Sequence, residues 1–300
     1  FGRDDEHQAD ELGVRYMSRV GYDPAQLSGV MAMLGQVTSE GGGGPPEWLS
    51  THPNPENREQ AILEMAAETQ VATDPAMVGR EDYIPRLDGM TFGVNPREGF
   101  FEGTRFYHPD MAFEMRFPDG WRTANSKQSV QAAPQEQDAI LALTLAQGGT
   151  PAEALSSFLA TEGMEAGPTS GAAINGIPAA SADFRVAVEG GMLQGRVSFV
   201  QHGETVLRLL GYGPANAWAN RQSAINASIQ SFQVLQDRTK LDVQPARIRV
   251  VTVPRAMDLE ALLAQEGAGQ HADAVLLLNR LEGNPTLPAG RMLKVPVGGV

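Results

Sequence analysis

Two acidic side chains near the start of the sequence are placed where a helix would bury them. Glu6 and Asp10 are four residues apart, so on a helix they lie on one face, one turn apart. Met17 and Val20 continue this face, which marks it as the side that packs against the protein interior. Burying a carboxylate without a partner costs several kcal/mol. The spacing therefore predicts a partner for both groups, either an arginine, a histidine or a metal ion.

An alternative interpretation of Glu6 and Asp10 needs no such partner. Both residues lie close to the first residue of the sequence, where a helix end can fray and stay solvated. The helix dipole also favours acidic side chains in the first turn of a helix. The burial of the two carboxylates distinguishes the two interpretations.

His52 is the second candidate for chemistry. It lies between Thr51 and Pro53, directly before the Asn54-Pro55 pair that starts a predicted helix. A histidine held in such a loop could act as a metal ligand, a gate or an acid. The competing interpretation is a histidine that packs or caps locally.

The elements that must position these residues are predicted to be helices, over residues 1–70. Gly21 marks the end of the first helix, and Asp23 followed by Pro24 is typical of the start of the second. The six residues 41–46 are all glycine or proline, which predicts a loop.

The middle of the chain changes from helical to strand periodicity. Residues 71–102 contain several turn signals and are predicted to form a linker, with a small hairpin at 90–94. Residues 103–237 alternate apolar and polar side chains, which predicts antiparallel strands interrupted by helices at 151–161 and 214–231. The strands are expected at 111–117, 140–145, 179–188, 193–201 and 205–211.

The last region, residues 244–300, is predicted to be a small βααβ unit. Strands at 248–253 and 292–295 flank two helices near 259–265 and 273–278. Together with the preceding regions, this predicts a multidomain α+β protein with a helical N-terminal part, an antiparallel sheet domain and a small C-terminal unit.

The composition excludes several classes of site. The chain has 300 residues, no cysteine and a formal net charge of −13. The lack of cysteine excludes disulfides, thiolate catalysis and cysteine-ligated zinc, and the acidic balance argues against nucleic acid as a partner. No apolar run reaches the roughly 20 residues that span a bilayer.

Because the sequence begins with Phe1 inside an amphipathic pattern, we expect a C-terminal part of a longer protein, whose membrane association would depend on preceding sequence.

The N-terminal residues resemble a known enzyme family, through motifs that follow one another in a fixed order. The segments are RDDEHQADELG (3–13), YM (16–17), GYDP (21–24), LSTHP (49–53) and Arg58. They are similar to the second half of the catalytic domain of peptidase family M48, which includes HtpX-like and BepA-like zinc endopeptidases of the gluzincin type. The resemblance implies a Zn²⁺ site in which Glu6 is a metal ligand and Asp10 orients a zinc-bound histidine. It also implies that His52 approaches the zinc as a gate or regulatory ligand, and that Arg58 supports the fold or the site.

The motif that supplies the other zinc ligands in this family is missing from the chain. The family needs His-Glu-x-x-His on a helix, which gives two ligands and the glutamate that activates water. The histidines of this sequence are at positions 7, 52, 108, 202 and 271, and no two are four residues apart. We therefore expect the motif to precede the chain, and we expect the chain alone to have no peptidase activity.

The later regions resemble two other families. Phe106–Pro109, Phe117–Trp121 and Asn175–Pro178 are similar to PsbP-like α+β domains, which implies a binding or docking module. In this module His108 and Trp121 are expected to be turn and core residues rather than ligand contacts.

The C-terminal region 244–300 resembles a LysM domain, through Ile248–Val253, Leu278-Asn279 and Leu287–Pro296. Such domains bind N-acetylglucosamine polymers, which implies peptidoglycan as a partner. Residues 255–258 replace the usual Gly-Asp-Thr, so a purely structural role is an equal alternative.

These inferences combine into one functional hypothesis and one alternative. The first is a zinc-dependent endopeptidase that acts on protein or peptide substrates in quality control of the bacterial periplasm or cell envelope, with this chain as its C-terminal part. The alternative is a non-catalytic envelope or peptidoglycan-binding protein that retains a peptidase scaffold.

Overall fold

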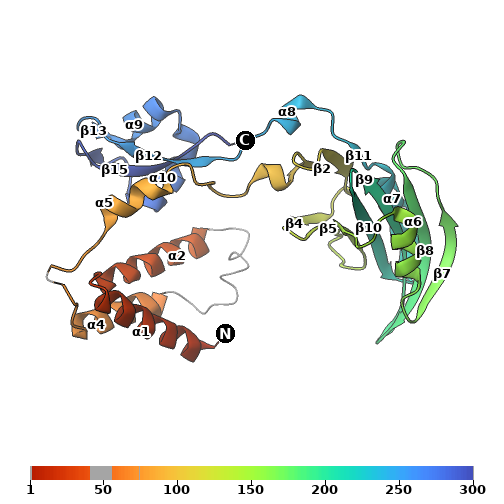
Figure 1. The fold of residues 1–300 in the computed structure, drawn as a ribbon, viewed down its shortest axis with the longest axis horizontal. Coiled ribbons are helices and arrows are strands. Elements are labelled where there is room, and N and C mark those ends of the chain that lie inside the picture. The colour runs from red at the N-terminus through yellow and green to blue at the C-terminus, as the bar shows by residue number, and fades with distance from the viewer. Residues whose placement is uncertain (1, 41–55, 74, 300) are drawn as a thin grey trace. The chain divides into compact units, whose positions relative to one another are not determined.

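The chain forms two compact units (Figure 1). The structure is a computed structural model and describes residues 2–40, 56–73 and 75–299. Unit 1 contains the chain up to Phe92 together with Arg247–Gly298, and unit 2 contains Gly93–Ala246 and the last two residues. Unit 1 is therefore discontinuous in sequence, because the segment that forms most of unit 2 is inserted between its two parts.

The N-terminal part of unit 1 is helical, as predicted. Its helices are α1 (Arg3–Arg19), the 3-10 helix η1 (Pro24–Leu27), α2 (Ser28–Glu40) and α4 (Glu56–Glu68). Val14, Met31 and Ile62, one from each α-helix, form the buried core of this part. The apolar positions of three helices thus meet in one cluster, which fixes α4 beside α1.

The boundary between α1 and η1 agrees with the sequence signals. Gly21 follows α1 with φ of 85°, a left-handed conformation that side chains other than hydrogen disfavour. The side chain of Asp23 then accepts a hydrogen bond from the backbone N–H of Ala25, at 3.0 Å, and so caps η1. The predicted stop and start are both confirmed.

Residues 71–102, which were expected to form a linker, contain several elements. These are α5 (Arg80–Tyr83), the 3-10 helices η2 (Ile84–Leu87) and η3 (Pro96–Glu98), and strand β1 (Phe100–Glu102). The hairpin expected at 90–94 is wrong. Instead, Gly89 donates to the carbonyl of Ile248 at 2.7 Å and Met90 accepts from the N–H of Ile248 at 2.8 Å. This segment pairs with a strand far away in the sequence because its backbone groups find a partner there.

The C-terminal part of unit 1 has the predicted βααβ order. Its elements are β12 (Arg247–Thr252), β13 (Met257–Asp258), α9 (Leu259–Glu266), η4 (Gly269–His271), α10 (Ala272–Asn279), β14 (Thr286–Leu287) and β15 (Met292–Val297). Strands β12 and β15 pair antiparallel, and so do β13 and β14. Leu262 of α9, Val275 of α10 and Leu293 of β15 are fully buried in its core.

Unit 2 contains two antiparallel sheets. The larger sheet has the strand order β4-β5-β6-β10-β9-β8-β7, and the smaller has β1-β2-β3-β11. The strands of the larger sheet are β4 (Arg122–Asn125), β5 (Ser129–Ala133), β6 (Ile140–Leu145), β7 (Met164–Ser170), β8 (Ala179–Val188), β9 (Gly191–His202) and β10 (Thr205–Pro214). Those of the smaller sheet, besides β1, are β2 (Arg105–His108), β3 (Phe113–Arg116) and β11 (Gln233–Val234). The helices of this unit, besides η3, are α6 (Pro151–Leu159), α7 (Trp218–Gln230) and α8 (Arg238–Leu241).

The helices α6 and α7 pack on different sides of the larger sheet. Val197 and Phe199 of β9 belong to the core that contains Leu155 of α6, whereas Val200 belongs to the core that contains Ile225 of α7. Successive side chains of a strand point to opposite faces, so β9 supplies both cores. The sheet is thus covered on both faces in this region.

Two predicted boundaries in unit 2 were wrong. One strand begins at Phe113 rather than Met111, because Ala112 has φ of 53° and breaks the extended backbone. Helix α7 begins at Trp218 rather than Pro214, because Pro214 is the last residue of β10. The sequence analysis did not predict strands β1, β2, β4, β5, β7 and β11.

In the part of the chain that the structure describes, no helix is both long enough and apolar enough to cross a membrane.

Candidate functional site

Helix α1 buries the two carboxylates that the sequence singled out. Glu6 and Asp10 are 8% and 5% exposed, so the solvated interpretation is wrong. The first turn of α1 carries Asp4 and Asp5 as well, which suits the positive end of the helix dipole. Asp5 also accepts a hydrogen bond from the backbone N–H of Gly2 at 2.8 Å and stabilises the start of the helix.

The partner of both carboxylates is Arg58 on α4. Its Nε donates to Oδ2 of Asp10 at 2.8 Å, and its Nη2 donates to Oδ1 of the same carboxylate at 2.7 Å. Its Nη1 lies 2.6 Å from Oε2 of Glu6. The guanidinium therefore binds Asp10 through two parallel hydrogen bonds and holds Glu6 with its third nitrogen. This geometry needs the planar fork of arginine, which a lysine cannot supply.

The electrostatics of this cluster act on Arg58. The hydrogen bond to Asp10 raises the pKa of Arg58 and outweighs the opposing effect of burial, with further contributions from the charges of Asp10 and Glu6. The side chain of Arg58 is 19% exposed, which leaves the cluster open to solvent on one side.

The described residues do not form a complete metal site. In residues 2–40, 56–73 and 75–299, no three or more histidine, aspartate or glutamate side chains are grouped so as to hold a metal ion. Glu6 and Asp10 are brought together as predicted, and His7 lies exposed on α1. His52 lies outside the described residues. The cluster can supply one carboxylate ligand and a second, fixed carboxylate beside it, and nothing more.

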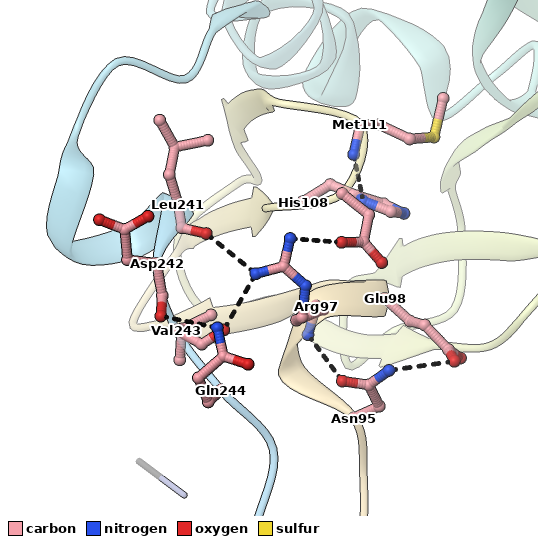
Figure 2. A network of polar contacts seen from close by, with 10 residues as sticks. Asn95, Arg97, Glu98, His108, Met111, Leu241, Asp242, Val243 and Gln244 are labelled. Carbon is pink, nitrogen blue, oxygen red and sulfur yellow. Dashed lines mark hydrogen bonds and ion pairs between the residues drawn. The ribbon is translucent and has the colours of Figure 1, made fainter.

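Unit 2 contains a different polar network, centred on Arg97 (Figure 2). Its guanidinium lies 2.6 Å from Oδ1 of Asp110 and donates to the carbonyls of Leu241 and Val243, at 3.1 and 3.2 Å. The backbone N–H of Arg97 donates to the side chain of Asn95 at 3.1 Å. These contacts hold the C-terminal end of α8 and the residues that follow it against the first residues of unit 2. The network therefore has a structural role.

His108 and His202 hold the backbone of one residue, Met111. Nδ1 of His108 accepts from the N–H of Met111 at 3.2 Å, and Nε2 of His202 contacts its carbonyl. Burial lowers the pKa of His108, although Asp110 and Glu98 act in the opposite direction. His108 therefore closes a turn, as predicted, and Figure 2 shows its ring beside Met111. Trp121, the other residue assigned to this role, packs against the main core of unit 2.

The sequence analysis missed a group of basic residues in unit 1, namely Arg80, Arg280 and Lys294. They line a common cavity, although Arg80 and its hydrogen-bond partner Met292 are 212 positions apart in the chain. The only sequence signal is the scarcity of cations in an acidic chain, and this does not indicate which of them meet.

Comparison with known proteins finds a family model that matches the helical part of unit 1. Residues 1–66 match peptidase family M48. The match contains the whole Glu6–Asp10–Arg58 cluster and supports a peptidase relationship for this part of the chain. No curated protein matches the chain.

Among solved structures, the neighbours include a cyanobacterial PsbP and LpqN. Cyanobacterial PsbP (CyanoP) from Synechocystis sp. PCC 6803 is 15% identical, with a TM-score of 0.37, over 45% of this chain and 94% of that one. LpqN of Mycobacterium tuberculosis, described as involved in cell envelope biogenesis, is 15% identical, with a TM-score of 0.34, over 41% of this chain and 83% of that one.

Proposed function

We propose that this chain is the C-terminal part of a zinc-dependent endopeptidase. The observation that supports this most is the buried Glu6–Asp10–Arg58 cluster, which lies inside the region that matches peptidase family M48. Members of this family are generally zinc-dependent. In this proposal Glu6 is a zinc ligand, Asp10 orients a zinc-bound histidine, and His52 serves as a gate or regulatory ligand.

The contacts of the cluster are compatible with these roles. Arg58 binds both oxygens of Asp10 and holds one oxygen of Glu6, so both carboxylates are fixed in direction. A carboxylate can contact a cation through one oxygen while the other stays hydrogen-bonded, an arrangement that is common around protein metal ions. Fixing the side chains in advance lowers the entropic cost of binding a metal.

The remaining groups of the proposed site must come from elsewhere. The 300 residues contain no His-Glu-x-x-His motif, so the other zinc ligands and the glutamate that activates water would be supplied by sequence outside this chain. Zinc, when bound, would polarise the peptide carbonyl and provide an activated water. The proposed substrates are proteins or peptides, and the proposed location is the bacterial periplasm or cell envelope.

The test uses the product of the complete open reading frame and the substitution Glu6→Gln. Glutamine keeps the shape of the side chain and an oxygen for Arg58, but it loses the charge that a zinc ligand needs. We expect zinc affinity and casein hydrolysis to fall on the order of 100-fold or more. Zinc content is measured by elemental analysis after dialysis, and hydrolysis is measured with and without a chelator.

Glu11→Gln is the matched control, because Glu11 is on the same helix but exposed. It should leave both measurements unchanged. The 300-residue chain alone should not cleave casein. The proposal is wrong if the complete protein binds no zinc, or if Glu6→Gln binds zinc as tightly as the unsubstituted protein.

A second proposal rests on the C-terminal part of unit 1. Its element order, β12–α9–α10–β15, is the βααβ arrangement on which the resemblance to LysM domains depends. In this alternative the chain is a non-catalytic protein that binds peptidoglycan through residues 244–300. Co-sedimentation of the chain with purified peptidoglycan tests it, and a chain that stays in the supernatant contradicts it.

A further inference from the structure

Unit 1 contains a cavity of about 690 Å³ whose charged residues are all cationic. They are Arg80 at the start of α5, Arg280 after α10 and Lys294 on β15. Its volume falls in the range of roughly 300–1,000 Å³ that is typical of ligand-binding sites in proteins. In a chain with a net charge of −13, three cations around one cavity are an unusual concentration of positive charge.

No carboxylate offsets these charges in the part of the chain that the structure describes. Among residues 2–40, 56–73 and 75–299, no carboxylate lies within ion-pair distance of any of the three cations. Arg80 does donate to the backbone carbonyl of Met292 at 3.2 Å. Burial lowers the pKa of Lys294, and the neighbouring charges of Arg80 and Arg280 lower it further. An anion placed among the three side chains would therefore relieve repulsion that the fold leaves uncompensated.

The side chain of Arg280 lies close to helix α2. Its guanidinium lies over Gly29 of α2, where a Cβ atom would lie 2.0 Å from Nη2. A larger residue at this position would displace the guanidinium from its place beside α2. Arg280 itself has φ of 51°, in the left-handed region that follows the end of α10. Arg280 is exposed, and its side chain lines the cavity beside α2.

The other walls of the cavity are mainly apolar and adaptable. Val30, Met33, Leu87 and Met90 line it. Methionine side chains are flexible and polarisable, and they fit apolar partners of different shapes. Val30 and Met90 are 41% and 52% exposed, so part of this apolar surface is open to a ligand.

We propose that this cavity binds the C-terminal end of a polypeptide, with the α-carboxylate among Arg80, Arg280 and Lys294 and the last apolar side chains against the methionine-lined wall. Such an end joins one anionic group directly to apolar side chains, which matches the arrangement of charge and apolar surface. This inference stands without the proposed peptidase activity, since it concerns binding by unit 1 alone.

The polar groups of the cavity favour a peptide over a fatty acyl chain, which would also combine a carboxylate with apolar surface. Tyr22, Tyr83 and Thr91 line the cavity, and within the described residues their hydroxyl groups have no hydrogen-bond partner. An acyl chain would cover these hydroxyls without pairing them, at a cost in free energy. A peptide backbone supplies donors and acceptors for them.

The test measures binding of a labelled peptide to the 300-residue chain by fluorescence anisotropy. The probe is a fluorescein-labelled hexapeptide that ends in Ala-Leu-Val-Leu with a free carboxylate, at an ionic strength of about 0.15 M. We expect it to bind at least about tenfold more tightly than the same peptide with a C-terminal amide. Arg280→Gln and Arg80→Gln should each weaken binding of the free acid about tenfold and leave binding of the amide unchanged.

Lys127→Gln is the matched control, because it removes one exposed positive charge from unit 2 and should not change binding. Circular dichroism checks that each variant is folded. Equal affinity of the acid and the amide contradicts the proposal, as does an Arg280→Gln variant that is folded and binds normally. Dodecanoate should not displace the peptide at comparable concentration, and displacement would assign the cavity to acyl chains instead.

Discussion

The guanidinium of Arg58 binds both oxygens of Asp10, at 2.8 and 2.7 Å, and so joins α4 to α1 across 48 positions of sequence. The same guanidinium reaches Glu6, one turn earlier on α1. Because a two-point contact fixes direction as well as distance, it sets the rotation of α1 about its own axis relative to α4. The apolar contacts of Val14 and Ile62 are compatible with this orientation, so packing and the ion pairs agree.

The first prediction concerns the loss of the Arg58 side chain. Arg58→Ala removes the cation that pairs with two buried carboxylates, which is far more costly than the loss of an exposed ion pair. We expect α1 and α4 to lose about 3 kcal/mol of stability, the lower end of the range for buried pairs, because Arg58 is partly exposed. Hydrogen exchange measured by mass spectrometry should show protection of these helices reduced about 100-fold.

The control for this prediction is Arg19→Ala, which removes an exposed cation at the end of α1 and should change protection by less than about threefold. Arg58→Lys keeps the charge but loses the two-point contact, so its effect should be intermediate. Unchanged protection of α1 in Arg58→Ala would mean that the ion pairs contribute nothing to the packing of these helices.

The sequence predicted the carboxylate pair but not its partner. The spacing of Glu6 and Asp10 was enough to place both on the buried face of α1, because helical periodicity is a local property. The partner could have been an arginine, a histidine or a metal, since nothing local specifies which distant side chain meets a helix face. The cationic group of Arg80, Arg280 and Lys294 was missed for the same reason.

The strands that were predicted differ from those that were missed in how clearly the local sequence shows their apolar alternation. The buried strands β6, β8, β9 and β10 were predicted, because their alternation of apolar side chains is visible in the sequence. Strands β4 and β7 are the two edges of the sheet, and nearly all their side chains are exposed. They are held by backbone pairing with β5 and β8, which leaves little apolar pattern to detect.

The second prediction is a loss of stability of unit 2 in mild acid, through His108. Burial lowers the pKa of His108 in the folded chain below 6.5, so the unfolded chain binds a proton that the folded chain does not. The stability that depends on neutral His108 is complete above about pH 6.5 and is lost as the pH falls below it. The slope can reach about 1.4 kcal/mol per pH unit, and protonation also removes the acceptor for the N–H of Met111.

His108→Asn separates this titration from the hydrogen bond, because an asparagine oxygen can accept from the same N–H without binding a proton. Urea unfolding followed by tryptophan fluorescence, in a Trp48→Phe background, reports on Trp121 and Trp218 of unit 2. Between about pH 7.5 and 5.5 the dependence of stability on pH should become shallower in His108→Asn. His7→Asn changes an exposed histidine of unit 1 and should leave the slope as it is. Equal slopes in all three proteins would contradict the prediction.

The third prediction concerns Asn279, whose side-chain amide forms the backbone hydrogen bonds that a neighbouring strand would otherwise provide. Its Nδ2 donates to the carbonyl of Lys294 at 2.8 Å, and its Oδ1 accepts from the N–H of Lys294 at 2.9 Å, so both backbone groups of this β15 residue are paired by one amide. Asn279→Leu fills a similar volume but leaves both groups unpaired, and we expect a loss of about 2–3 kcal/mol in the C-terminal part of unit 1. Hydrogen exchange of β12 and β15 measures the loss, and Gln265→Leu, at an exposed position of α9, is the control with no such effect. If β15 stays as well protected in Asn279→Leu as in the control, the amide does not stabilise the strand edge.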